Sequence, residues 1–105
     1  VQTCALPIFM KVADDMLGDF YRSVNPMLHA RQLRRTGNYR RAAEFVTHQS
    51  GEAAAEEAFD ISNNPSRENL RQEVFGRQRS VSVGDIVEVN GEEFFCAAMG
   101  WQKMS

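Results

Sequence analysis

The clearest alternation of hydrophobic and polar positions lies near the C-terminus, where two β-rich runs flank Asn90-Gly91. An Asn-Gly pair between such runs predicts a hairpin, because both loop residues of a type I′ turn need positive φ. A two-residue loop gives the register Val89–Glu92, Glu88–Glu93, Val87–Phe94 and Ile86–Phe95. One face then carries four residues that we assign to the core: Val87, Val89, Phe94 and Cys96. The other face pairs Glu88 with Glu93, a like-charge contact that is tolerable only in water.

Helical spacing predicts two helices upstream of this hairpin. Ser50 is a favourable N-cap for a helix over Glu52–Ile61, and Glu52 suits the positive end of its dipole. Its core side is predicted to carry Ala55, Ala58, Phe59 and Ile61. A shorter helix over Met27–Arg35 lies between Asn25-Pro26 and the stop Thr36-Gly37-Asn38.

The other segments give weaker patterns. Met10–Phe20 is a weak amphipathic stretch, and Ser66–Arg79 is polar with one predicted helical turn at Leu70–Val74 and a break at Gly76. Tyr39–Gln49 fits a helix and a strand equally well, so its pattern leaves both alternatives open.

The first nine residues lack the features of a signal peptide, because they carry no positive charge and Gln2 and Thr3 interrupt the apolar run. Pro7 would also break a helix that continued through it. Residues 1–8 instead match an in-frame translation of a common short-read sequencing adapter, with Phe9 as a hybrid codon. A buried first strand is the less favoured alternative. We therefore expect a non-native segment over residues 1–9, with Met10 as the first native residue or an internal one.

Composition favours one small domain. The chain has 105 residues, 43% of them hydrophobic and 25% charged, as in ordinary soluble proteins. Setting aside the first segment removes Cys4 and leaves Cys96 alone, which excludes an intrachain disulfide and favours a reducing, cytoplasmic location.

The net charge of −2 hides an asymmetry along the chain. The stretch from Arg22 to Ala43 contains no acidic residue and has six arginines: Arg22, Arg31, Arg34, Arg35, Arg40 and Arg41. Such a run can contact phosphates and, with interleaved Tyr21, His29 and Tyr39, stack on bases. Its other interpretation is a solvated basic surface, which we favour slightly.

The segment "RSVSVGDIVEVNGEEFFCAAMGWQKM", Arg79 to Met104, resembles the C-terminal motif of the YodL-like domain family and its actinobacterial and phage relatives. The matching residues are Ser80, Ser82, Val83, Gly84, Asp85, Ile86, Val87, Phe94, Phe95, Gly100 and Trp101. Trp101 stands where Phe is usual. The upstream "NYRRAAEFVTHQSGEAAAEEAFDISNN" is also similar to that family, which implies that Tyr39–Gln49 is a strand.

The resemblance implies a small α+β domain of strand, helix and hairpin (βαββ) over residues 38–104, with a short C-terminal strand. A basic helical arm over residues 10–37 precedes it. Members of the family occur in phages, plasmids and integrative elements, often near antirestriction and conjugation functions, so the resemblance implies a mobile-element setting and not a reaction.

The residue types show no catalytic constellation. Cys96 lies mid-strand on the predicted core face, where a buried small hydrophobe is expected rather than a nucleophile. His29 and His48 lack spaced partners for zinc, and the glutamates at the hairpin tip lack a calcium-loop pattern. We interpret Gly84 as a backbone bend and Asp85 as a local acceptor that fixes the start of the strand.

We therefore expect a non-enzymatic module, without cofactor or metal, that binds a host or mobile-element protein. The alternative is nucleic-acid binding through the basic segment 22–41. The candidate binding residues are Arg31, Arg34, Arg35, Arg40, Arg41 and Trp101. Trp101 serves either as an exposed anchor for a partner or as a seal over the open end of the core, and we favour the seal.

Overall fold

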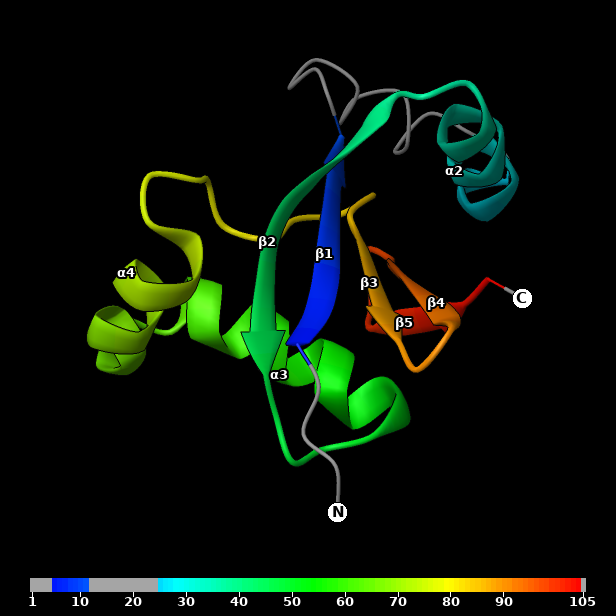
Figure 1. The fold of residues 1–105 in the computed structure, drawn as a ribbon. Helices are drawn as coiled ribbons and strands as arrows, with labels where there is room; N and C mark the ends of the chain where they lie inside the picture. Colours follow the sequence, from blue (N-terminus) through cyan, green and yellow to red (C-terminus); the bar gives the residue numbers. More distant parts are fainter. Residues whose placement is uncertain (1–4, 12–24, 105) are drawn as a thin grey trace.

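The computed structural model describes residues 5–11 and 25–104, and Figure 1 shows that they form a twisted sheet with helices on both sides. Along the chain the elements are β1 (Ala5–Lys11), α2 (Pro26–Arg35), β2 (Tyr39–Val46), α3 (Gly51–Asn63), the 3-10 turn η1 (Pro65–Arg67), α4 (Glu68–Phe75), β3 (Ile86–Val89), β4 (Glu92–Cys96) and β5 (Trp101–Lys103). The sheet is antiparallel and has the order β2-β1-β3-β4-β5. The chain is thus a small α+β domain.

The structure confirms the predicted C-terminal hairpin, including all four predicted cross-strand residue pairs. β3 and β4 are joined by Asn90 and Gly91, whose φ angles of 52° and 84° are those that a two-residue hairpin loop needs. The register is the predicted one: Ile86–Phe95, Val87–Phe94, Glu88–Glu93 and Val89–Glu92. The four residues assigned to the core face are all buried in one cluster.

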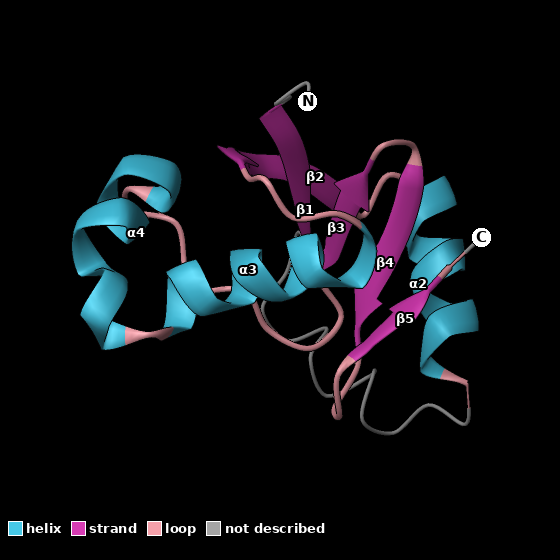
Figure 2. Ribbon diagram, turned by 90° about the horizontal axis from the view of Figure 1, so that it is seen from below, coloured by secondary structure: helices cyan, strands magenta, loops and turns pink. Residues whose placement is uncertain are grey.

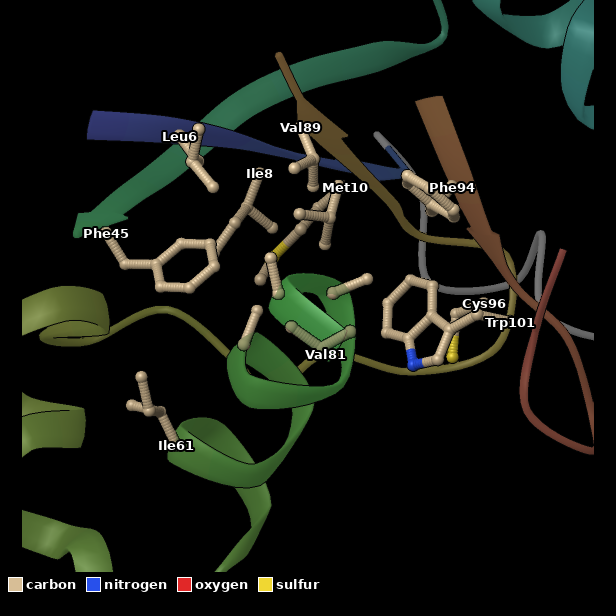
Figure 3. Packing of buried hydrophobic residues seen from close by; sticks show 14 of the residues in the cluster. Leu6, Ile8, Met10, Phe45, Ile61, Val81, Val89, Phe94, Cys96 and Trp101 are labelled. Atoms are coloured by element: carbon tan, nitrogen blue, oxygen red, sulfur yellow. The ribbon is translucent and has the colours of Figure 1, made fainter. Parts of the chain in front are cut away.

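That cluster lies between the sheet and α3 (Figure 3). Three of the four predicted core residues of α3, Ala55, Ala58 and Ile61, are buried, and Phe59 is partly buried against them. α3 begins at Gly51 and ends at Asn63, close to the predicted bounds, although Ser50 makes no capping hydrogen bond through its side chain. α4 extends this layer through Leu70 and Val74 and is longer than the single turn predicted there; it ends before Gly76, as expected.

A second cluster covers the opposite face, where the sequence predicted solvent. Ile86 and Phe95 are buried there under α2, together with Ala30, Tyr39 and Met104. Figure 2 shows α2 and α3 on opposite sides of β4. Helix α2 is therefore part of the domain rather than an arm beside it. The prediction of a water-facing surface holds only for the end that carries Glu88 and Glu93, both of which are partly exposed.

The exclusion of residues 1–8 from the fold is wrong for Ala5–Ile8. These residues belong to β1, which pairs with β2 on one side and with β3 on the other. Leu6, Ile8 and Met10 alternate along the strand and are buried in the α3 cluster (Figure 3), which is the period-two pattern of a strand with one face in a core. β1 thus separates β2 from the hairpin. The adapter origin of the segment remains a prediction.

Two other expectations meet the structure only in part. The segment Tyr39–Gln49 forms a strand, as the family resemblance implied, but the strand, β2, ends at Val46. The amphipathic stretch Met10–Phe20 begins inside β1, and residues 12–20 lie outside the described part of the chain.

Candidate binding site

The outer side of α2 carries a hollow of about 390 Å³. Its lining joins helix, hairpin and C-terminus: Leu28, Arg31, Arg34, Arg35, Glu93 and Met104. We call it the α2 hollow. It brings together three of the six predicted binding residues, and its apolar wall includes Leu28, which is 47% exposed.

The local sequence explains why α2 forms and presents these arginines. Asn25 accepts a hydrogen bond at Oδ1 from the Leu28 amide, 3.1 Å away, and Pro26 occupies the first helical turn, where no amide donor is lost. Arg34 and Arg35 lie in the last turn, where a positive charge stabilises the negative end of the helix dipole. The inner side of α2 packs on the sheet through Ala30, Met27 and Leu33, so the remaining positions face outward.

Arg34 is held in place by two contacts with the sheet. Its Nε donates to Glu93 Oε2 over 3.0 Å, and its guanidinium carbon lies 3.9 Å from the centre of the Phe9 ring. A planar guanidinium can make an ion pair and stack on an aromatic face at the same time. Arg34 therefore contributes a fixed charge, partly neutralised by Glu93, at the inner edge of the hollow.

The other two arginines of the hollow differ in their freedom. Arg31 donates from Nη2 to the backbone carbonyl of Met104, which ties the C-terminal end of the described chain to α2. Arg35 is exposed, and its side chain makes no hydrogen bond or ion pair with a described residue. Arg35 is thus the guanidinium best placed to meet a ligand.

Arg40 and Arg41 lie outside the hollow, on β2. Arg40 is exposed, and Arg41 makes an ion pair of 2.6 Å with Glu44, in which both side chains are more than half exposed. Arg41 is the cross-strand partner of Phe9, the residue on which Arg34 stacks. The five arginines of the basic segment that the structure describes therefore form two groups, three around the hollow and two on the edge strand, and Phe9 contacts one group and pairs with the other. Arg22 lies outside the described residues.

Trp101 is a core residue rather than an exposed anchor. It is 8% exposed, and its indole Nε1 donates to Glu56 Oε2 over 3.0 Å, so it fastens β5 to α3. The exposed hydrophobe beside it is Met99. Cys96 is buried, as predicted.

Arg79 and Asp85 form a charged pair in the loop before β3, and the sequence predicted a role for only one of the two residues. Asp85 is completely buried and accepts two hydrogen bonds from Arg79, of 2.7 and 2.9 Å, and a third of 2.9 Å from the Ser82 amide. The role of Asp85 as a local acceptor is confirmed, and Gly84 makes the expected bend with φ of 94°. Arg79 was missed because its link to Asp85 depends on how the loop 76–85 folds, which no periodicity encodes.

Tyr39 completes this region from the opposite side. Its hydroxyl donates to the backbone carbonyl of Gly84. Burial, together with the negative charge of Asp85, raises the pKa of Tyr39 well above its ordinary value of 10.0. The buried Tyr39 and Asp85, with the partly buried Arg79, therefore hold the start of β3 against β2 and act as a structural unit.

Within 5–11 and 25–104, no group of three or more His, Cys, Asp and Glu side chains is placed to hold a metal ion. In the same part of the chain, no helix has the length and apolar character to cross a membrane.

Comparison with known proteins adds no assignment to this geometry. No family model matches the chain, and neither a curated protein nor a solved structure gives a significant match. The likeness of Arg79–Met104 to the YodL-like family thus stays a prediction from its motif, and the α2 hollow rests on its own geometry.

Proposed function

We propose that the protein is a non-enzymatic interaction module that binds an acidic and apolar segment of another protein in the α2 hollow. One observation supports this above the others: the hollow combines three arginines with the exposed side chain of Leu28. Arginine and exposed aliphatic surface together suit a peptide that carries both carboxylates and hydrophobic side chains. Phosphates alone would leave Leu28 without a partner.

The charge distribution around the hollow also favours a protein over a nucleic acid. Glu93 lies in its lining and neutralises part of the Arg34 charge. A phosphate backbone has one charge at each regular step and would be repelled by that carboxylate. A peptide can place its acidic side chain at Arg35 and an apolar one at Leu28.

Nucleic-acid binding is the second candidate, and a separate observation favours it. Arg34 stacks on the ring of Phe9, and Arg41 is the cross-strand neighbour of Phe9 on β2. Guanidinium groups around an aromatic side chain are typical of surfaces that hold single-stranded bases and phosphates. This function uses Arg40 and Arg41 as well as the hollow.

The mobile-element setting belongs to the same proposal and rests on the family resemblance. The motif from Ser80 to Trp101 supports it, and the genes that flank this one would test it. Neighbours of phage, plasmid or conjugation type are expected, and a chromosomal housekeeping operon would contradict the setting.

Two matched variants separate the two functions. Arg35→Glu and Arg40→Glu make the same change of charge at exposed positions, but only Arg35 lines the hollow. Binding is measured by fluorescence anisotropy with two labelled probes, a short peptide of alternating glutamate and leucine and a short DNA oligonucleotide. We expect the peptide to bind, Arg35→Glu to weaken it about tenfold, and Arg40→Glu to leave it unchanged.

Two results would contradict the proposal. If the DNA probe binds with steep salt dependence and both variants weaken it equally, nucleic-acid binding replaces protein binding. If the two variants reduce peptide affinity to the same extent, the attraction is one of overall charge and the hollow has no special part in it.

A further inference from the structure

β2 is the outermost strand of the described sheet, and α4 packs against it without adding a strand to its edge. β2 pairs with β1 alone, and among the described residues no backbone hydrogen bond reaches its other edge from a turn or a loop. It spans the eight residues Tyr39–Val46 and contains no proline, so every residue of the strand keeps its backbone amide donor. Figure 1 shows it as the outermost strand of the sheet. An edge of this kind is suited to pairing with another strand.

A bulge in β2 determines which of its side chains share a face. The register with β1 shifts between Ile8 and Phe9, so Ala42 has no partner of its own on β1. Ala42 and Ala43 both pack against the α3 cluster as a result. Arg41 and Glu44 then lie on the other face, where their ion pair of 2.6 Å joins them. In a regular strand, residues three apart would point to opposite faces.

This arrangement is complementary to itself under a two-fold rotation. When two β2 strands pair antiparallel about an axis between Ala42 and Ala43, Arg41 of each copy lies opposite Glu44 of the other. Opposed residues must share a face, and the bulge gives Arg41 and Glu44 that property. The same register sets Tyr39 opposite Val46, whose side chain is largely exposed in the single chain.

We propose that two copies of this chain associate through their β2 strands in this register. The two intrachain Arg41–Glu44 pairs and two new interchain pairs then form a ring of alternating charge. Directly opposed side chains in an antiparallel pair have Cβ atoms about 5 Å apart, close enough for each new ion pair. A second copy fits better than an unrelated strand because one sequence supplies both charges in the required order.

Registers centred on a charged residue, rather than between Ala42 and Ala43, would bring like charges together. Centring the pair on residue 44 would place Glu44 against Glu44 of the second copy, and centring it on Arg41 would place two arginines together. Like charges in direct opposition destabilise a strand pair. The attractive register is therefore the one centred between the two alanines.

A charge-swap series tests the proposal by sedimentation velocity from low to high micromolar concentration. The monomer has a mass of 11.9 kDa, and the wild-type chain is expected to approach twice that mass as its concentration rises. Arg41→Glu and Glu44→Arg each create two like-charge contacts across the axis and should weaken dimerisation about tenfold. The double variant Arg41→Glu/Glu44→Arg restores opposite charges and should dimerise like the wild type.

Arg35→Glu is the control, because it makes the same charge change outside β2 and should not alter dimerisation. Both β2 positions are exposed, and circular dichroism confirms that each variant is folded before it is measured. A wild type that stays monomeric throughout would overturn the proposal. So would a double variant that is as monomeric as the single ones. Peptide binding at the α2 hollow is independent of these outcomes, so the two proposals fail separately.

Discussion

Replacing Asp85 with asparagine removes the charge at the centre of the loop that leads into β3. The wild-type carboxylate is completely buried and receives three hydrogen bonds, two from the Arg79 guanidinium and one from the Ser82 amide. Asparagine has nearly the same shape but directs an N–H₂ group toward one of these donors. Asp85→Asn therefore removes the negative charge that faces the Arg79 guanidinium while creating little empty space.

The magnitude follows from the burial of the two partners. Removing one member of a fully buried ion pair costs about 3–5 kcal/mol. Arg79 keeps 28% of its side-chain surface exposed and also donates to the Ser80 carbonyl, so water and this bond offset part of the loss. We expect a loss of about 3 kcal/mol in the free energy of unfolding, a large part of the 5–15 kcal/mol that a domain typically has.

Urea denaturation followed by circular dichroism measures this difference. Asp60→Asn is the control, because Asp60 makes a similar ion pair of 2.9 Å with Arg67 but both side chains are partly exposed. Asp60→Asn is expected to lower the free energy of unfolding much less than Asp85→Asn does, because water screens an exposed ion pair. If Asp85→Asn destabilises the protein no more than Asp60→Asn does, the buried pair is not the support of the loop that we describe.

The remaining predictions concern the pH dependence of stability and the contribution of β1 to the core. The raised pKa of Tyr39 means that the folded state holds the phenolic proton more tightly than the unfolded state, so this contribution to stability is complete below pH 10 and declines above it. Unfolding free energies measured from pH about 8 to about 11 should fall more steeply for the wild type than for Tyr39→Phe, and parallel curves would contradict this. Ile8→Ala should cost about 3 kcal/mol in urea denaturation, because Ile8 is fully buried in a strand paired on both sides. A loss below about 1 kcal/mol would show that β1 adds little to the core.

Local rules predict the hairpin and the helices well because each depends on neighbouring residues. Asn90-Gly91 determines the loop length, and the loop length then sets the whole register of β3 and β4. Helix α3 follows from its small apolar residues at helical spacing. The antiparallel pair and the helix could therefore be placed without knowledge of the rest of the chain.

The second core and β1 depend on contacts distant in sequence. Ile86 and Phe95 share a face with Glu88 and Glu93, which predicts a solvent-exposed face. They are buried because α2, which lies earlier in the sequence, packs on that face. β1 alternates as a strand should, but its likeness to an adapter sequence argued against including it. Pairing with β2 and β3 is a tertiary outcome that no local pattern of residues 5–11 reveals.

The candidate site was predicted in composition but not in arrangement. The acid-free arginine run indicated a basic surface, yet Glu93, from a hairpin 59 residues beyond Arg34, lies within it and neutralises part of its charge. Leu28 carried no signal, because its exposure depends on how α2 is rotated against the sheet. The mixed character of the hollow, on which the proposed function depends, comes from tertiary packing.

Peptide binding by Leu28→Ala tests the central claim most directly, because the claim requires an apolar contact beside the arginines. Met99→Ala is the matched control, since Met99 is an exposed hydrophobe outside the hollow. With the labelled peptide of alternating glutamate and leucine, Leu28→Ala should weaken binding about fivefold, as expected for losing roughly half of a leucine's buried surface. Met99→Ala should leave the affinity unchanged. Equal affinities for the wild type and Leu28→Ala would contradict the account and reduce the hollow to a patch of positive charge.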